Sequence, residues 1–317
     1  MRRFPFVQLD VFSATRLEGN PLAVFTDGRG LSDAEMQALA REMNLSETTF
    51  VLPRSAAVER RRGVQVRIFT PEEELPFAGH PTLGTAMVLR DLGRVRPGQG
   101  HATRRSKTAG LKAGGTSRQE EVLLDLKVGK IPVTFHEEAG KVFGEMRQRD
   151  PKFGVVHDRW TVARLAGLKV SEIATDLPVQ TVSTGVAFAI APVKSLKALT
   201  ELRLDWRTLS GYLQQGSDAQ FFYFVTRETQ DPTARLHARM VFANGEDPAT
   251  GSAAGCAGAW MVRYGLAQAN ERVLIEQGIE AKRPSRIFVR AGMKGNRVTN
   301  VRVGGHAVKV LRGEVVL

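Results

Sequence analysis

Two segments of the chain repeat one pattern of apolar and polar positions. Residues 64–89 read VQVRIFTPEEELPFAGHPTLGTAMVL, and residues 236–262 read LHARMVFANGEDPATGSAAGCAGAWMV. Each begins with a short apolar strand, continues through an acidic loop to a polar residue, His80 or Asp247, and ends in a run of small residues after a proline. That run predicts a helix that is apolar all round and therefore buried. The repeat indicates two related halves, each built on one buried helix.

The two helix starts are the first candidates for chemistry. We expect Pro81 and Pro248 at the first helical position, where the missing N–H costs nothing. His80 and Asp247 would then take the N-cap position. Capping alone would explain Asp247, because Asp is a favoured cap, whereas His is a poor cap and favours a functional interpretation. Taken singly, each residue is explained more simply by capping.

The backbone at these helix starts suits an anion. The N–H groups and the dipole at a helix N-terminus bind carboxylate or phosphate. Gly79 in the first copy and Gly251-Ser252 in the second supply backbone that can approach a ligand closely. The two copies therefore predict a small anionic ligand in a cleft between the halves.

The remaining pattern predicts strands with a few helices among them. Ser32 and Glu35 form a capping box before an amphipathic helix, and a second amphipathic stretch covers residues 196–214. β-rich or alternating runs predict strands at residues 6–12, 22–25, 45–52, 64–68, 122–128, 130–136, 179–190, 221–226, 237–242, 273–275, 286–290 and 308–311. We expect an α+β fold of two domains, residues 1–128 and 129–317, and we allow for the last strand returning to the first domain.

Composition and charge narrow the classes of function. The 317 residues are 42% hydrophobic, which is ample for two cores, and 45 Lys and Arg against 33 Asp and Glu give a net charge of +12. A basic surface could bind nucleic acid. The tight basic runs, residues 60–62 and 104–107, lie in polar stretches expected to be loops, and no aromatic residues are interleaved with them. Residues 94–121, rich in Gly, Arg, Lys and Ser, are expected to be irregular. We expect solvated charge and no nucleic-acid partner.

Cysteine, membrane and metal signals add little. Cys256 is the single cysteine, so no disulfide can form within the chain and a thiolate metal site is excluded. No segment approaches the roughly 20 apolar residues of a membrane span, and the N-terminus MRRFPFVQLDVF lacks the apolar run of a signal peptide. His136 begins like a zinc-protease helix, but Gly140 stands where the second His should be. We expect a cytoplasmic protein without a membrane, metal or nucleotide site.

Six motifs occur in order between about Phe6 and Ile287, nearly the whole chain. They are DVFSATRLEGNPLAVF, NLSETTFV, IFTPEEELPFAGHPTLG, TVSTG, MVFANGEDPATGSAAG and EQGIEAKRPSRI. Together they resemble the PhzF family, the phenazine-biosynthesis-like isomerases, which share the diaminopimelate epimerase fold. The resemblance implies two pseudo-symmetric domains, each a β-barrel-like sheet wrapped around a central helix, with the active site in the cleft between them.

The resemblance also implies an activity and the residues that carry it. The family enzyme isomerises trans-2,3-dihydro-3-hydroxyanthranilate without a cofactor. Glu47, in NLSETTFV, is implied as the proton shuttle, although the pattern alone would place it at a solvent-facing strand edge. His80 and Asp247 are implied as its catalytic partners. The residues implied in substrate binding are Gly79, Thr250, Gly251 and Ser252.

Related epimerases use one cysteine in each half as an acid/base pair, and this chain departs from them. The motif GHPTLG contains no cysteine, and Cys256 falls four residues beyond Ser252, about one helical turn further on. The departure argues against a two-thiol mechanism. We interpret Cys256 as a small core residue.

We therefore expect a cofactor-independent isomerase of a small anionic carboxylate, assembled as a homodimer. The substrate carboxylate would meet the helix starts, Glu47 would move the proton, and His80 and Asp247 would hold amine or hydroxyl groups. Two alternatives stay open. One is a catalytically inactive protein of this fold that binds a partner, and the other is a nucleic-acid-associated protein, given the charge of +12.

Overall fold

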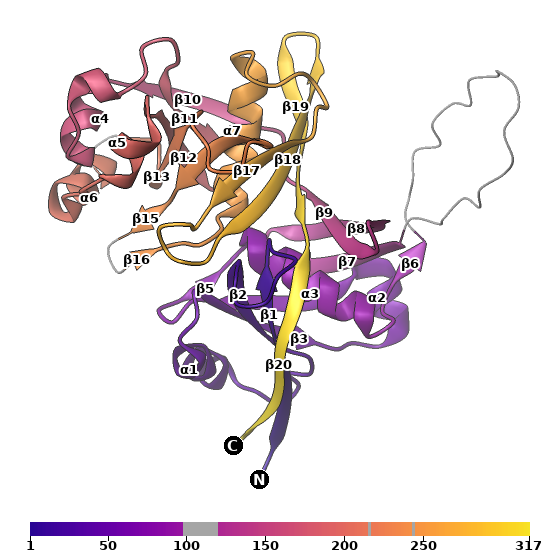
Figure 1. The fold of residues 1–317 in the computed structure, drawn as a ribbon. Coiled ribbons are helices and arrows are strands. Elements are labelled where there is room, and N and C mark those ends of the chain that lie inside the picture. Colours follow the sequence, from indigo (N-terminus) through magenta and orange to yellow (C-terminus); the bar gives the residue numbers. More distant parts are fainter. Residues whose placement is uncertain (98–119, 215–216, 243–244) are drawn as a thin grey trace, which may run out of the picture.

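The computed structural model describes residues 1–97, 120–214, 217–242 and 245–317. These residues form two lobes, which Figure 1 draws one above the other. Most of the stretch predicted to be irregular, including the basic run at 104–107, lies outside the described residues.

The lower lobe in Figure 1 is built mainly from the N-terminal half of the chain. Its elements are β1 (Arg3–Val11), β2 (Asn20–Phe25), α1 (Asp33–Met43), β3 (Glu47–Leu52), α2 (Ala56–Arg62), β4 (Val64–Phe69), β5 (Glu74–Leu75), α3 (Gly79–Asp91), β6 (Arg96–Pro97), β7 (Glu120–Leu126), β8 (Gly129–Glu138) and β9 (Lys141–Arg147). β2 pairs antiparallel with β1 and parallel with β3, and β3 pairs antiparallel with β4. β4 then runs parallel to β7, which continues into the antiparallel β7-β8-β9 meander.

The upper lobe repeats this plan with the second half of the chain. Its elements are β10 (Lys152–His157), α4 (Arg159–Ala166), a 3₁₀ turn (Val170–Glu172), β11 (Val179–Ser183), β12 (Ala187–Pro192), α5 (Leu196–Thr200), α6 (Trp206–Gln214), β13 (Phe221–Thr226), β14 (Ala234–Arg239), β15 (Val241–Phe242), β16 (Gly245–Glu246), α7 (Gly251–Arg263), β17 (Val273–Gln277), β18 (Ser285–Lys294) and β19 (Arg297–Gly305). Two pairings are parallel, β12 with β13 and β14 with β17, and the others are antiparallel.

Each lobe wraps its strands around one buried helix. Every residue of α3 from Gly79 to Leu89 is buried, and α7 is buried from Ala253 to Met261. α3 packs on β1, β2 and β7, whereas α7 packs on β18, β19 and β12. In α7 the Gly and Ser residues lower the helix propensity, and close packing against the surrounding strands compensates for this loss. The prediction of two buried central helices is confirmed.

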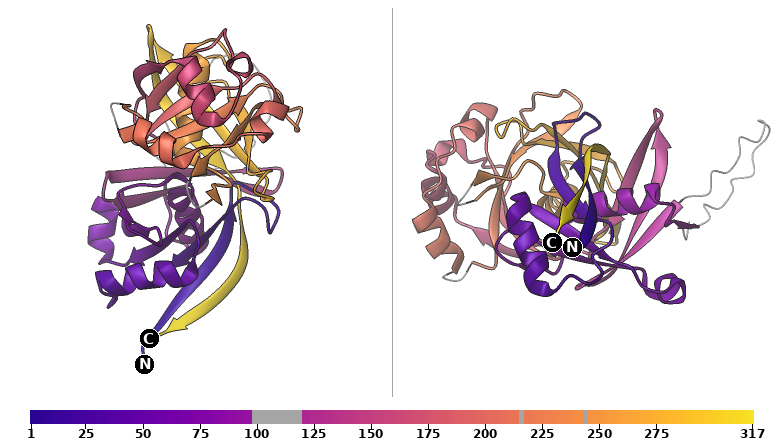
Figure 2. Two further views of the ribbon diagram at one scale, coloured as in Figure 1. Left: turned by 90° about the vertical axis from the view of Figure 1, so that its left-hand side faces the viewer. Right: turned by 90° about the horizontal axis from the view of Figure 1, so that it is seen from below.

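The last strand, β20 (Ala307–Val316), leaves the upper lobe and pairs antiparallel with β1 along its whole length. Figure 2 shows the two chain ends side by side. β9 also pairs with β19, so strands from the two lobes meet in one continuous sheet. One apolar core cluster likewise includes residues of both lobes. The division at residues 128 and 129 stays a prediction, and the pairing of β7 with β8 spans that point.

The structure corrects the predicted helix starts. α3 begins at Gly79, so Pro81 is its third residue, and α7 begins at Gly251, so Pro248 lies three residues before it. The N-caps are therefore Ala78 and Thr250, and neither His80 nor Asp247 is a cap. Proline is tolerated throughout the first turn, because those N–H groups have no intrahelical partner, and its position therefore does not fix the helix start.

Other expected elements differ in detail. The arginines at 60–62 form the last turn of helix α2 rather than a loop, a place where positive charge favours the helix dipole. The expected strand at 179–190 is the two strands β11 and β12, and the amphipathic stretch at 196–214 is the two helices α5 and α6. The capping box of Ser32 and Glu35 is confirmed. The elements that we did not predict are the helices α2 and α4, the 3₁₀ turn, and the strands β5, β6, β9, β10, β16 and β19.

Candidate active site

Glu47 is the first residue of β3, and its carboxyl group points into the interior rather than into solvent. Pairing of β3 with β2 fixes the backbone there, with Leu22 opposite Glu47. Only 15% of the Glu47 side chain is exposed. Burial, followed by the negative charge of Asp247, raises the pKa of Glu47 well above its ordinary value. This carboxyl group therefore holds a proton more tightly than a carboxyl group in water.

His80 faces Glu47 from the first turn of α3. Its Nε2 lies 3.4 Å from Oε2 of Glu47, and the residue is 3% exposed. Burial lowers the pKa of His80 to about 3, so the imidazole is neutral at neutral pH. Among the described residues, neither His80 Nε2 nor Glu47 Oε2 has a hydrogen-bond partner. Two buried polar atoms thus face each other and leave their bonding capacity for a third group.

Asp247 joins the same cluster from the loop between β16 and α7. Its Oδ1 accepts a hydrogen bond from Asn20 Nδ2 at 2.6 Å, and its Oδ2 accepts one from Thr250 Oγ1 at 2.6 Å. These bonds lower the pKa of Asp247, but burial outweighs them and raises it to about 6. Asp247 and Glu47 repel each other when both are ionised, so they titrate as a pair.

Asn20 was not among the predicted site residues, and it lies at the centre of the cluster. It is the first residue of β2 and is fully buried. Its Nδ2 lies 3.2 Å from His80 Nδ1 and also contacts Asp247 Oδ1, while it donates to Ala249 O at 3.0 Å. The only sequence signal for this residue is its place in GNPLAVF, one of the motifs that carry the family resemblance.

The starts of the two central helices touch each other. A Cβ atom added to Gly79 would lie 2.9 Å from the backbone nitrogen of Ser252 and 3.0 Å from Gly251 Cα. Neither helix start has a side-chain cap, whereas α1, α4 and α5 are capped by Ser32, Asp158 and Ser195. The first N–H groups of α3 and α7 have no intrahelical partners, so two helix dipoles converge on one point.

Two side chains hold the loop that carries Asp247. Gln277 Nε2 donates to Asp247 O at 2.7 Å, and Gln277 Oε1 accepts from Thr250 N at 3.1 Å. Arg239 makes a two-pronged ion pair with Glu246, with nitrogen–oxygen distances of 2.9 and 2.8 Å. The glutamine bridges hold the backbone that directly precedes α7.

The seven predicted site residues all lie in this one region. One of them lies at the start of β3, and the others lie at or just before the two touching helix starts. The seven residues are Glu47, His80, Asp247, Gly79, Thr250, Gly251 and Ser252. Cys256 lies deeper in α7 and is fully buried, and burial raises the pKa of its thiol to about 11. It is a core residue, as predicted. The roles of the seven residues stay predictions.

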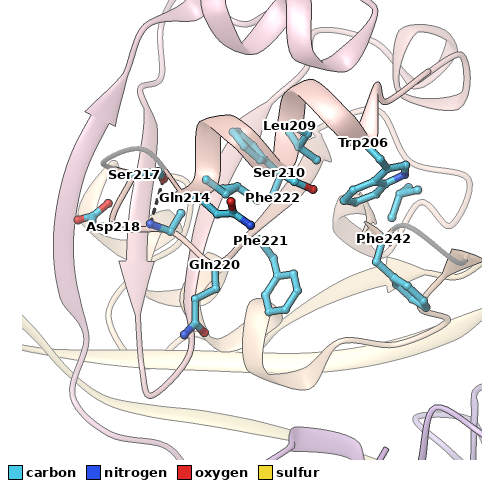
Figure 3. A pocket seen from close by; sticks show the side chains of 13 residues that line it. Trp206, Leu209, Ser210, Gln214, Ser217, Asp218, Gln220, Phe221, Phe222 and Phe242 are labelled. Carbon is cyan, nitrogen blue, oxygen red and sulfur yellow. Dashed lines mark hydrogen bonds between the residues drawn. The ribbon is translucent and has the colours of Figure 1, made fainter. Parts of the chain in front are cut away.

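A separate cavity of about 570 Å³ lies in the upper lobe beside α6. Figure 3 shows its aromatic side chains, Trp206, Phe221, Phe222 and Phe242, together with Asp218. None of the seven predicted site residues lines it. The features expected of an acid–base site belong to the cluster of buried titratable groups and not to this cavity.

Comparison with known proteins identifies the family of this chain. The sequence model of the PhzC-PhzF family, described as phenazine biosynthesis-like protein, matches residues 9–99 and 97–313. The chain belongs to this family. Among PhzC-PhzF relatives, the chain is 34% identical over 322 residues to trans-2,3-dihydro-3-hydroxyanthranilate isomerase of Pseudomonas chlororaphis, covering 98% of this chain and 99% of the relative. It is 36% identical over 319 residues to an uncharacterized isomerase of Mesorhizobium japonicum, covering 98% of each.

Solved structures agree with the PhzC-PhzF assignment. A PhzF-family phenazine biosynthesis protein of Bacillus anthracis superposes with a TM-score of 0.82 at 26% identity, covering 100% of both chains. A hydroxyproline epimerase of Agrobacterium vitis shares the fold alone, with a TM-score of 0.63 at 13% identity over 99% of this chain and 91% of that one. The predicted α+β, epimerase-like fold is confirmed.

Membership in the PhzC-PhzF family, whose curated relatives include isomerases, supports an isomerase activity and a small-molecule substrate. No helix within the described part of the chain is long and apolar enough to cross a membrane. Across the same residues, no group of three or more His, Cys, Asp and Glu side chains could hold a metal ion. The homodimer and the cytoplasmic location stay predictions.

Proposed function

We propose that this protein isomerises a small cyclic carboxylate by moving one proton between two carbons, with Glu47 as the proton carrier. The observation that carries the proposal is the facing pair of Glu47 Oε2 and His80 Nε2, buried 3.4 Å apart and both without a hydrogen-bond partner among the described residues. The relative from Pseudomonas chlororaphis is a trans-2,3-dihydro-3-hydroxyanthranilate isomerase, so trans-2,3-dihydro-3-hydroxyanthranilate is the first substrate to test.

The environment of Glu47 suits a group that must both accept and return a proton. A general acid–base is most effective when its pKa lies near the working pH. Burial and the neighbouring charge of Asp247 move the pKa of Glu47 upward, in the required direction. A neutral His80 adds no positive charge that would reverse this shift.

The touching helix starts favour a carboxylate substrate. Uncapped N–H groups and two helix dipoles converge where Gly79 meets Ser252. A carboxylate held there would lie beside Glu47 and His80, and the absence of a Cβ atom on Gly79 lets the two helix starts come together. Exclusion of water by a bound substrate would strengthen each of these contacts.

The proposed reaction conserves protons and electrons. Ionised Glu47 removes a proton from one carbon of the substrate, and the electron pair of that C–H bond moves into the conjugated system. The carboxylic acid so formed returns the proton to a second carbon, which regenerates Glu47. His80 and Asp247 orient the substrate's amine or hydroxyl group and stabilise the charge that develops between the two steps.

The test compares Glu47→Gln with wild type on trans-2,3-dihydro-3-hydroxyanthranilate. General acid–base catalysis contributes about 10²–10⁴-fold, so kcat of Glu47→Gln should fall by at least ~100-fold while substrate binding persists. In D₂O, wild type should place solvent deuterium on the carbon that receives the proton, and the variant should place none.

Glu42→Gln is the matched control, because Glu42 is an exposed residue of α1 and its turnover should equal that of wild type. Full turnover by Glu47→Gln would remove the proposed proton carrier. Wild-type binding without turnover or deuterium exchange would favour the inactive binding protein instead.

A further inference from the structure

We propose that Asn20 is a positioning residue that keeps the His80 proton on Nε2, where it faces Glu47, and holds Asp247 beside it. The activity part of this proposal rests on the proposed function, but the position of the His80 proton does not. Asn20 itself reaches none of the atoms proposed to react. It acts through its contacts with His80 and Asp247.

The orientation of the Asn20 amide follows from a neighbour that can only accept. One amide atom of Asn20 lies 3.0 Å from the carbonyl oxygen of Ala249, and a carbonyl oxygen has no proton to donate. That atom must therefore be the nitrogen Nδ2. The same nitrogen lies 2.6 Å from Asp247 Oδ1 and 3.2 Å from His80 Nδ1. Oδ1 of Asn20 is buried and has no hydrogen-bond partner among the described residues. The contacts of Nδ2 alone therefore hold the Asn20 side chain in its orientation.

The nitrogen of Asn20 in turn decides the tautomer of His80. An amide NH₂ group donates and does not accept, so a protonated Nδ1 on His80 would face it with no acceptor between them. Nδ1 must therefore be the unprotonated nitrogen. A neutral imidazole has one ring proton, which leaves it on Nε2, the atom 3.4 Å from Glu47 Oε2. Nδ2 has two protons for three neighbouring acceptors, so the contact with Nδ1 is a shared one, and it is the absence of any acceptor at Nδ2 that sets the chemistry at Nε2.

The backbone around Asn20 is anchored to the second half of the chain. Gly19 N donates to Pro284 O at 3.0 Å, and Arg283 Nε donates to Gly19 O at 2.7 Å. Arg283 also makes an ion pair with the buried Asp10 at 2.6 Å. Asn20 therefore sits on a segment held from both lobes. Its amide can fix the distance between His80 of the first half and Asp247 of the second.

The experiment uses ¹⁵N-histidine-labelled protein, with His80→Leu to identify the His80 resonances. In wild type near neutral pH, the Nε2 resonance of His80 should be that of a protonated nitrogen and the Nδ1 resonance that of an unprotonated one. Asn20→Asp places a carboxylate of the same shape against Nδ1, so Nδ1 should gain a proton. Asn20→Ala removes the donor and should leave a mixture of tautomers.

The same variants have an expected activity. kcat of Asn20→Asp on trans-2,3-dihydro-3-hydroxyanthranilate should fall by ~100-fold or more with a much smaller change in KM, because the misplaced proton affects the chemical step. Asn296→Asp makes the same chemical change on the exposed turn between β18 and β19, and it should match wild type.

The outcomes test the role of Asn20 separately from the proposed isomerase activity. A wild-type His80 that carries its proton on Nδ1 overturns the role of Asn20, even when the enzyme is active. An Asn20→Ala protein that keeps both the Nε2 proton and wild-type kcat overturns it as well. Wild-type protein with the expected tautomer but no turnover supports the role of Asn20 and contradicts the proposed substrate. The wild-type resonance remains decisive even if Asn20→Asp fails to fold.

Discussion

The starts of α3 and α7 are similar in construction and different in what they supply. Both helices begin with glycine, both lack a side-chain cap, and their backbones touch at Gly79 and Ser252. α3 carries its titratable group, His80, as the second residue of the helix. In α7 the second residue is Ser252, and the titratable Asp247 lies four residues before the helix.

The difference shows that the two copies of the repeat are offset. The residue–proline pairs align His80 with Asp247 in the sequence, but position in the helix aligns His80 with Ser252. The site is therefore asymmetric, because the α3 side supplies a neutral imidazole and the α7 side supplies a hydrogen-bonded carboxyl group. Such an arrangement suits two different tasks better than two equal acid–base groups.

The largest expected effect tests that asymmetry directly. His80→Leu should lower kcat by about 10²–10⁴-fold, as expected for the loss of a polar group from an acid–base site. Ser252→Ala removes a single neutral hydroxyl group, so it should cost no more than ~10-fold in kcat/KM. Steady-state kinetics of both variants on the same substrate gives the comparison. Equal losses of kcat/KM in the two variants would mean that the two helix starts contribute equally to catalysis.

A second prediction concerns the contact between the helix starts. Gly79→Ala places a Cβ 2.9 Å from the backbone of Ser252, which cannot rotate away, so the helices must separate. We expect a loss of about 1–3 kcal/mol in the free energy of unfolding, measured by denaturant titration, together with reduced activity.

Gly211→Ala is the control for this change. Gly211 lies in α6, and an added Cβ there would meet no atom within 4 Å. Helix propensity predicts that Gly211→Ala is stabilising by roughly 0.5–1 kcal/mol. If Gly79→Ala behaved like Gly211→Ala, the close contact of the two helices would be contradicted.

The smallest expected effect is on how the stability of the folded protein depends on pH. Burial raises the pKa of Asp247 from 3.8 to about 6. The folded state therefore binds this proton more tightly than the unfolded state, and wild-type stability falls as pH rises through that interval. Asp247→Asn removes the titration, so its Tm relative to wild type should rise between about pH 4 and pH 6 and level off above.

We expect the gain in that variant to be about 0.5–2 kcal/mol near neutral pH, at the expense of activity. Calorimetry of both proteins at matched pH values would measure it. Asp247→Asn also removes the negative charge that helps to raise the pKa of Glu47, so the Tm difference reports on the coupled pair, and both effects have the same sign. A Tm difference that is constant with pH would contradict the raised pKa.

The central helices could be predicted from the sequence because their composition leaves no polar face. In a strand-rich chain, the natural place to bury a run such as GSAAGCAGA on all sides is the inside of a curled sheet. The exact helix starts could not be predicted. The start of α7 illustrates the reason, because Gln277, which is distant in sequence, holds the backbone of Asp247 and Thr250 just before the helix.

Glu47 and Asn20 show where local pattern fails within the site. Each is the first residue of a strand, a position that alternation assigns to either face with equal ease. Their burial arises only when α3 and the loop before α7 close over them. The family resemblance identified Glu47 by its motif. Asn20 required the distances to His80 and Asp247.

The pairing of β1 with β20 constrains how the chain is made. β1 lies between β2 and β20, so one edge of the first strand stays open until the last strand arrives. During synthesis, the lower lobe therefore lacks a strand until β20, which follows every element of the upper lobe, has left the ribosome. The first lobe to be translated is consequently the last to be completed.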